Sequence, residues 1–167
     1  MSYRNKTYVI FDGESDMWAY RYMNGWRVSK HIEFDFHDAH DINAIADYSQ
    51  PDTVRRRLRE RFSTAKQAIV LIGENTRHKH RFVRWEMDVA LGLDLPIVVV
   101  NLNGQRQLDP FLCPPILRDE YLVHVSFKAR IIKYALDNFP PFYRQRSADA
   151  RGALYYPASV YKSLGLD

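Results

Sequence analysis

The sequence has little cysteine and no long apolar segment. Its single cysteine, Cys113, excludes an internal disulfide and suits a reducing compartment. No apolar run approaches the length that spans a bilayer, and the segment MSYRNKTYVIF lacks the apolar region of a signal peptide. We therefore expect a cytoplasmic protein without a membrane partner, and its 167 residues fit one ordinary domain core.

Several motifs of nucleotide-binding and catalytic proteins are also missing. The chain has no GxxxxGK[ST] phosphate loop, no GxGxxG dinucleotide fingerprint and no GxSxG nucleophile elbow. A response-regulator receiver would share the expected topology, and Asp12 could supply part of its acidic pocket. However, Ile72 and Gly73 stand where such a receiver needs its phosphoacceptor aspartate. These absences exclude the commonest phosphate-binding and acyl-transfer enzymes.

The net charge of +4 comes largely from arginines in two segments, 55–61 and 144–151. The first segment lies on a predicted helix whose other face is apolar, so a solvated helix face explains it. No zinc pattern, reading helix or stacking motif accompanies the charge. Nucleic acid is therefore not an expected partner, whereas an anionic nucleotide would be attracted.

Strands and helices are predicted to alternate along the chain. Segments 68–72 and 97–100 are Val- and Ile-rich without alternation, which is typical of strands buried on both faces of a parallel sheet. Further strands are expected at 6–11, 31–36 and 121–125. This order predicts an α/β fold of flavodoxin-like type, a doubly wound parallel sheet of five strands in the order 2-1-3-4-5.

The helix signals set the expected boundaries. A first helix should start near Ser15 or Asp16 and end before Gly25, and a second should cover 51–66. A last helix should be capped by Ser126 and stopped by the pair Pro140–Pro141. We expect a domain over residues 1–140, followed by a basic, tyrosine-rich extension, 141–167, packed on the domain or on a partner.

The helix expected over 82–91 carries an acidic residue in an unusual position. At 100° per residue, Arg84 and Asp88 share the polar side, whereas Glu86 projects into the apolar arc between Phe82 and Ala90. A carboxylate there is costly unless it is paired, hydrogen-bonded or facing a cleft. An ion pair with a neighbouring arginine and a place in a functional cleft are both compatible with this pattern.

In a doubly wound sheet, ligands bind beyond the carboxyl ends of the strands. The loops expected there are 12–16 and 73–80, with the polar loop after the second strand beside them. That polar loop contains His37, Asp38, His40 and Asp41, which could hold a metal, although helix capping explains the same residues. We expect no metal and no cofactor.

Beyond these patterns, the segment VLIGENTRHKHRFVRWEMDVAL, at 70–91, resembles the TIR-like domains of bacterial Thoeris antiphage systems. The order of elements extends this resemblance from about Lys6 to Phe139, including the segment FDFHDAHD. In ordinary TIR domains the glutamate follows a WxxE-like pattern, whereas here Glu86 directly adjoins Trp85. The resemblance implies a cytosolic sensor that cleaves NAD at the nicotinamide–ribose bond.

The resemblance also implies roles for particular residues. Glu86 takes the place of the catalytic glutamate, and Phe11 and Asp12 match positions that line the nucleotide site. We further assign ribose or phosphate binding to Asp12, Ser15 and Asn75, and stacking to Phe11 and Trp85. Core packing is the structural alternative for both aromatic residues, and a turn or cap is the alternative for Asn75.

Two functions from different classes remain open at this stage. The first is an NAD-consuming enzyme whose ADP-ribose-derived product, cyclic in many relatives, activates a separate effector protein. Such an enzyme would use NAD as substrate, respond to a phage-derived trigger and form a homo-oligomer on activation. The second is a non-catalytic TIR-like module that binds a protein partner or a nucleotide.

Overall fold

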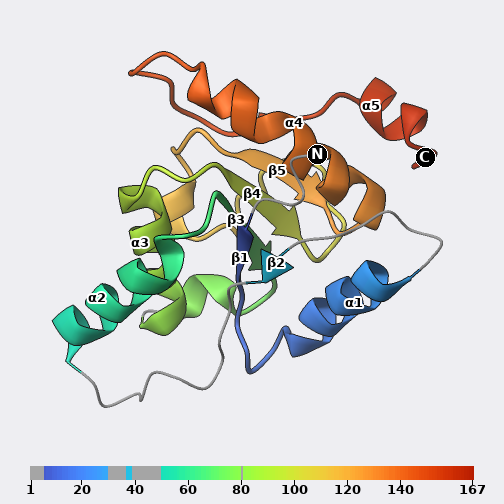
Figure 1. Cartoon of the computed structure of the whole chain (residues 1–167). Helices are drawn as coiled ribbons and strands as arrows, with labels where there is room; N and C mark the ends of the chain where they lie inside the picture. The colour runs from blue at the N-terminus through green and yellow to red at the C-terminus, as the bar shows by residue number, and fades with distance from the viewer. Residues whose placement is uncertain (1–5, 30–36, 39–49, 80) are drawn as a thin grey trace.

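The computed structural model describes residues 6–29, 37–38, 50–79 and 81–167. Parallel strands form one sheet in the order β2-β1-β3-β4-β5-β6 (Figure 1). The strands are β1 (Lys6–Ile10), β2 (His37–Asp38), β3 (Gln67–Ile72), β4 (Ile97–Asn101), β5 (Val123–Ser126) and β6 (Leu154–Tyr155). The predicted flavodoxin-like α/β class is therefore confirmed. The first five strands have the order 2-1-3-4-5, and β6 adds a sixth strand beside β5.

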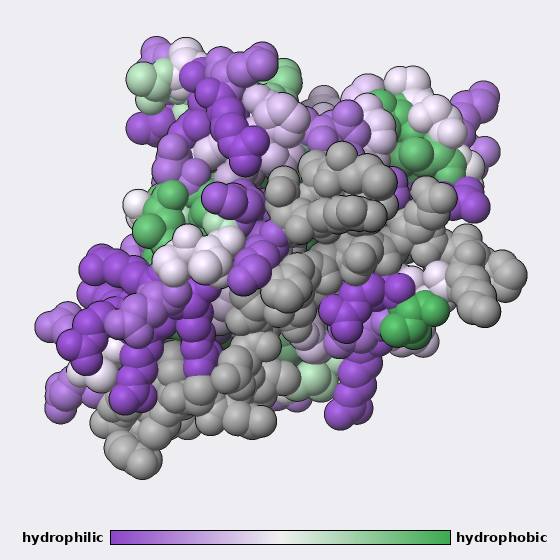
Figure 2. All heavy atoms as spheres, viewed as in Figure 1, coloured by the Kyte–Doolittle hydropathy of each residue, from purple (hydrophilic) through white to green (hydrophobic). Residues whose placement is uncertain are grey.

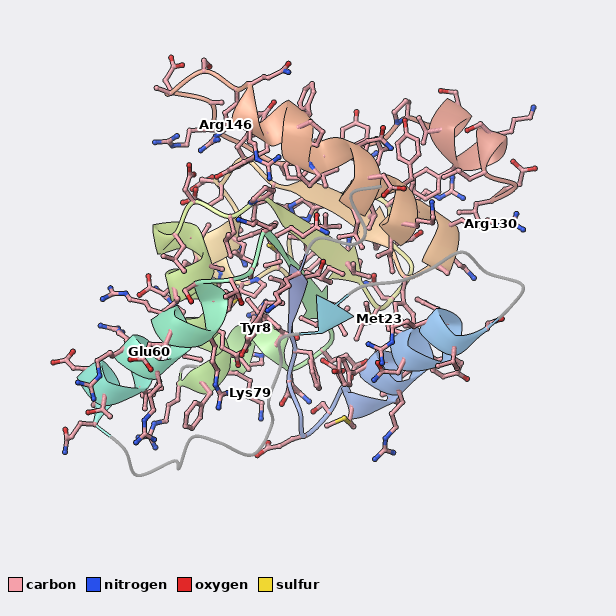
Figure 3. The ribbon with its side chains drawn as sticks, viewed as in Figure 1. Tyr8, Met23, Glu60, Lys79, Arg130 and Arg146 are labelled. Atoms are coloured by element: carbon pink, nitrogen blue, oxygen red, sulfur yellow. The ribbon has the colours of Figure 1, made fainter. Side chains whose placement is uncertain are left out.

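Helices cover both faces of the sheet (Figure 1). They are α1 (Met17–Val28), α2 (Pro51–Phe62), α3 (Phe82–Gly92), α4 (Ala129–Arg144) and α5 (Ala158–Ser163), with short 3-10 turns η2 (Thr76–His78) and η3 (Pro115–Leu117). The pair α2 and α3 packs on one face, and α1, α4 and α5 pack on the other. In Figure 3, Tyr8 accordingly lies toward α2, and Met23 lies between α1 and the sheet.

The strand residues divide the core into two layers. Every residue of β3 and of β4 is buried, as expected for strands covered on both faces. Ile69 and Leu71 face the α1 and α4 layer, whereas Val70 and Ile72 face α2 and α3. Because side chains alternate along a strand, each face of the sheet receives its own apolar layer.

The arginine-rich segment is a solvated helix face, as predicted. Val54, Leu58 and Phe62 form the buried stripe of α2, and its first-turn Pro51 sits where a missing N–H costs nothing. Arg56, Arg57 and Arg59 are exposed. Figure 2 shows the hydrophilic surface that gathers over this helix.

Four predicted boundaries were wrong by two to four residues. Helix α1 passes Gly25 and ends at Val28, while α2 ends at Phe62 and not at residue 66. Ser126 does not cap the last helix, because it pairs with Asn101 as the last residue of β5. That helix begins instead at Ala129. Strand β5 begins at Val123, two residues later than expected from the sequence.

Helix α4 continues through Pro140 and Pro141, which were expected to stop it. Each proline removes one backbone donor, but the last turn gains contacts of its own. Tyr143 is buried there, and its hydroxyl donates a 2.7 Å hydrogen bond to Asp94 Oδ1. The expected domain boundary at residue 140 therefore falls inside a helix.

The segment after α4 returns to the sheet. Strand β6 pairs in parallel with β5, and Tyr161 of α5 is fully buried. Tyr161 Oη accepts a 3.2 Å hydrogen bond from the backbone N–H of Ser126. These contacts tie α5 to the end of β5.

Two further expectations concern the second strand and the membrane. The predicted strand 31–36 lies outside the described residues, and the described strand, β2, begins at His37, which was expected in a loop. Within the described ranges, no helix is both long and apolar enough to cross a bilayer.

Candidate functional site

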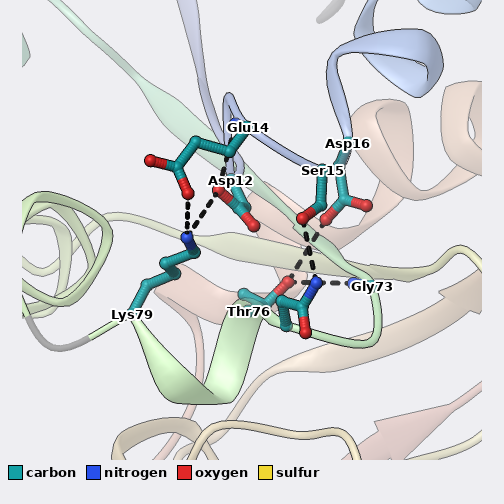
Figure 4. A network of polar contacts seen from close by, with 8 residues as sticks. Asp12, Glu14, Ser15, Asp16, Gly73, Thr76 and Lys79 are labelled. Atoms are coloured by element: carbon teal, nitrogen blue, oxygen red, sulfur yellow. Dashed lines mark hydrogen bonds and ion pairs between the residues drawn. The ribbon is translucent and has the colours of Figure 1, made fainter.

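Two loops meet at the carboxyl ends of β1 and β3. The first, residues 11–16, leads from β1 to α1, and the second, residues 73–75, leads from β3 to η2. Asn75 Nδ2 donates a 2.9 Å hydrogen bond to Ser15 Oγ, and Thr76 Oγ1 donates one of 3.4 Å to Asp16 Oδ2 (Figure 4). These bonds join segments that lie far apart in the sequence, and they fix the loops relative to each other.

The glycine of the GENT segment is required by this junction. The backbone N–H of Gly73 donates a 2.9 Å hydrogen bond to Thr76 Oγ1. A Cβ atom at Gly73 would lie 2.5 Å from both carboxylate oxygens of Asp16, which is far inside van der Waals contact. Burial, and then the charge of Asp12, raise the pKa of the Asp16 carboxyl, while the bond from Thr76 lowers it. Gly73 is thus the residue that lets a buried acid sit against the strand end.

Asp12 is buried directly beyond β1. Its Oδ1 accepts a 3.1 Å hydrogen bond from the N–H of Glu14 and lies 3.5 Å from Lys79 Nζ. Its Oδ2 accepts no hydrogen bond from the part of the chain that the structure describes. Lys79 also contacts the Glu14 carboxylate, and this bond is the main reason for the raised pKa of the lysine. The Lys79 ammonium group therefore lies between the carboxylates of Asp12 and Glu14.

A pocket of about 280 Å³ opens beside this junction. The β1–α1 segment, the β3–η2 loop and the loop after β4 contribute its lining residues, which are Ser15, Asp16, Trp18, Gly73, Glu74, Asn75, Leu102, Asn103 and Leu112. Ser15 and Asn75 were predicted ligand-binding residues, and the structure brings them together at this opening. Trp18 was missed, because one aromatic residue in the first turn of a helix reads as ordinary packing.

Glu86 lies on the other face of the sheet, in the second turn of α3. Only 6% of the residue is exposed. The Tyr8 hydroxyl of β1 donates a hydrogen bond to its carboxylate, and the Tyr8 ring is stacked on Phe62 of α2 at 3.9 Å. Burial raises the pKa of Glu86 to about 8, although Tyr8 and the charge of Arg61 act in the opposite direction. The acid expected on the apolar arc is therefore buried, as predicted.

The environment of Glu86 includes features of both sequence hypotheses. Arg61 contributes an attractive charge, as the ion-pair hypothesis requires. A carboxyl with a pKa near 8 is also the kind of perturbed group that active sites use. Glu86 does not line the pocket beside Ser15 and Asn75. The predicted site residues thus fall on two sides of the strand ends.

The two predicted stacking residues lie in different layers. Phe11 is 3% exposed and stacks on Tyr20 of α1 at 4.7 Å. Trp85 is half-buried, contacts Phe82 edge-to-face at 5.6 Å and has the guanidinium of Arg81 5.8 Å from its ring centroid. Both rings pack as their structural alternative expected, and their roles in stacking a ligand stay predictions.

The possible metal ligands are described only in part. His37 and Asp38 form β2, whereas His40 and Asp41 lie outside the described residues. Within the described ranges, no group of three or more His, Cys, Asp or Glu side chains is placed to hold a metal ion. Cys113 is buried, and burial raises the pKa of its thiol to about 11.

The fold and the loop junction define a class of protein. It is a flavodoxin-like α/β protein with a small pocket at the carboxyl ends of its strands and a buried acid on the helix after β3. The family model of the Thoeris protein ThsB, TIR-like domain, matches residues 8–107, more than half of the chain. The chain therefore belongs to this family of TIR-like antiphage-defence proteins. No curated protein matches it.

Proposed function

We propose that this protein cleaves the nicotinamide–ribose bond of NAD, with Glu86 as its catalytic residue. The observation that carries the proposal is the buried carboxyl of Glu86, whose pKa is raised to about 8. An acid held in a desolvated site is costly to maintain, and such groups concentrate where chemistry needs them. Membership of the TIR-like family is compatible with this activity.

The reaction needs little machinery. Nicotinamide leaves with the electron pair of the C–N bond and becomes neutral, so no proton has to be supplied to it. Positive charge then develops on the ribose ring, and the ionised Glu86 carboxylate stabilises it from close by. Water attacks C1′ to give ADP-ribose and a proton. Attack on C1′ by a nucleophilic atom of the same ADP-ribosyl group, in place of water, gives a cyclic product and a proton.

Tyr8 acts on this chemistry through Glu86. Its ring is fixed between β1 and α2, so the hydrogen bond from its hydroxyl orients the carboxylate. The same bond favours the ionised form of Glu86 and lowers its pKa. Tyr8 is therefore a positioning residue, which the sequence had not indicated.

The product is proposed to act as a signal in defence. In this proposal an ADP-ribose-derived nucleotide activates a separate effector protein, a phage-derived trigger starts the reaction, and the chain assembles as a homo-oligomer on activation. The likeness to Thoeris TIR-like proteins is the support for these three steps.

Nicotinamide release tests the proposal. Cells that express this protein within its Thoeris system are infected with a phage that the system restricts. NAD and nicotinamide are then measured by chromatography. The wild type should consume NAD, and Glu86→Gln should not. The matched control is Glu60→Gln, which changes an exposed acid of α2 and should behave as the wild type. Equal nicotinamide release by the wild type and by Glu86→Gln would refute the catalytic role.

The second candidate is a non-catalytic interaction module. The Glu86 carboxylate is bonded to Tyr8 and lies within the field of Arg61, which a purely structural acid would also require. Under this hypothesis, infection leaves NAD unchanged in wild-type cells that are nevertheless protected. Protection that persists in Glu86→Gln would favour it further.

A further inference from the structure

The pocket beside Ser15 and Asn75, which we call the Trp18 pocket, is not lined by Glu86, and its volume limits what it can bind. Its volume of about 280 Å³ lies at or below the lower end of small-molecule sites, roughly 300–1,000 Å³. It can therefore take one ring system and not a whole dinucleotide. Leu102 and Leu112 contribute apolar surface, while the two loops at the strand ends contribute polar groups.

Trp18 gives this pocket an aromatic surface. The residue is 46% exposed, which is unusual for tryptophan on a small domain. Its ring contacts are with Tyr22 at 6.0 Å and Phe127 at 5.6 Å, and both neighbours are nearly perpendicular to the indole. These contacts orient the indole while much of its surface stays open. An exposed and oriented indole is suited to stacking a flat heterocycle.

Asn75 supplies a donor and an acceptor at the same opening. One N–H of its amide is used by Ser15 Oγ, which leaves the second N–H and the carbonyl oxygen. An amide with both groups available can pair with the N6 amino group and N7 of adenine. The residue is exposed, and its neighbour Thr76 is fixed by bonds to Gly73 and Asp16.

The charge of the rim argues against a phosphate in this pocket. Among the described residues, Asp16 and Glu74 line it, and no lysine or arginine does. Acidic groups repel a phosphate but accept hydrogen bonds from an amino group. A phosphate-binding role for Ser15 and Asn75 therefore fits this pocket less well than contact with a base.

We propose that the Trp18 pocket binds the adenine base of NAD, with Trp18 stacking on the base and Asn75 pairing with its edge. The assignment rests on the proposed function for the identity of the dinucleotide. The pocket is on the α1 side of the strand ends, and Glu86 is on the α3 side. The two ends of one substrate are thus recognised on opposite sides of the β1 terminus.

Binding of the two halves of NAD tests the assignment. AMP and nicotinamide mononucleotide are titrated separately into the full-length Glu86→Gln protein by calorimetry, so that no turnover interferes. Adding Trp18→Ala should weaken AMP binding about tenfold to a hundredfold, as expected for loss of base stacking. Nicotinamide mononucleotide binding should not change. Asn75→Ala should reduce the preference for AMP over GMP.

Matched controls separate this effect from a general disturbance of α1. Val28→Ala trims another exposed apolar residue of the same helix that does not line the pocket, and AMP should bind to this variant as before. Trp18→Phe keeps a smaller ring and should lose less affinity than Trp18→Ala. If circular dichroism shows that Trp18→Ala is unfolded, Trp18→Phe and Asn75→Ala decide the question.

Three results would overturn the assignment: no AMP binding at all, equal AMP binding by all variants, or competition between AMP and nicotinamide mononucleotide for this pocket. Failure of the proposed function looks different, because it is read from nicotinamide release by the wild type. AMP binding that depends on Trp18 without NAD cleavage would preserve the pocket and refute the enzyme. NAD cleavage with an unchanged KM in Trp18→Ala would refute the pocket alone.

Discussion

The two sides of the β1 terminus are built on different principles. On the α1 side, Ser15 and Asn75 are exposed and bonded to each other at the rim of an open pocket. On the α3 side, Glu86 of α3 is buried and receives a hydrogen bond from Tyr8. Exposed polar groups can recognise a ligand without a large desolvation cost, whereas a buried acid is costly and strongly perturbed. Recognition on one side and chemistry on the other is the arrangement that this difference favours.

The largest expected difference between the two sides is in the pH dependence of stability. The folded state raises the pKa of Glu86 to about 8 from an ordinary value of 4.5. Between these values the folded chain keeps the proton that the unfolded chain releases. Stability from this group is therefore complete below pH 4.5 and is lost as the pH rises to about 8, by about 1.4 kcal/mol per pH unit.

Glu86→Gln should remove this loss. Denaturant unfolding at pH 5 and at pH 9 should show a variant that gains stability over the wild type as the pH rises. The difference between the two proteins cancels the titration of all other groups. Glu60→Gln on the exposed face of α2 is the control and should follow the wild type. Parallel stability curves for the wild type and Glu86→Gln would show that Glu86 titrates normally.

The loop junction on the α1 side should respond to a single methyl group. Gly73→Ala would place its Cβ 2.5 Å from the Asp16 carboxylate. We expect a loss of stability of roughly 1–3 kcal/mol, because overpacking forces either the loop or the acid to move. Thermal unfolding measures it.

Gly25→Ala is the matched control for Gly73→Ala. A Cβ at Gly25 meets nothing within 4 Å, and the residue is exposed inside α1. This change should stabilise the chain by about 0.5–1 kcal/mol through helix propensity. If Gly73→Ala is as well tolerated as Gly25→Ala, the junction is looser than its contacts indicate.

The smallest expected effect is on the orientation and ionisation of Glu86. Tyr8→Phe keeps the ring stacked on Phe62 but removes the hydroxyl that bonds to the carboxylate. Since that bond lowers the pKa of Glu86, its loss should raise the pKa further. Carbon-13 NMR of labelled glutamate follows the titration. An unchanged pKa would mean that Tyr8 does not act on Glu86.

The sequence predicted the centre of the fold well because its signal there is local. Segments 68–72 and 97–100 could be assigned as buried parallel strands, since strands covered on both faces carry continuous apolar runs. The burial of Glu86 followed from helical spacing alone. Ser15 and Asn75 could be placed at one edge because parallel strands share a carboxyl end.

What the sequence did not predict depends on contacts between distant segments. Helix α4 continues past Pro140 and Pro141, and its last turn is held by the hydrogen bond from Tyr143 to Asp94. In the sequence, Tyr8 looks like an ordinary buried strand residue. Its contacts with Phe62 of α2 and Glu86 of α3 form only in the folded chain, so they could not be predicted. Trp18 becomes part of a pocket only when the loops after β3 and β4 fold beside it.

The most direct measurement of the central claim is the pH dependence of nicotinamide release from NAD by the active protein. If the ionised Glu86 performs the cleavage, kcat/KM should rise about tenfold per pH unit below 8, level off above it, and lie about a hundredfold lower at pH 6. Glu86→Gln should show no such rise. A wild-type profile that stays flat from pH 6 to 9, at a rate that Glu86→Gln shares, would contradict the account.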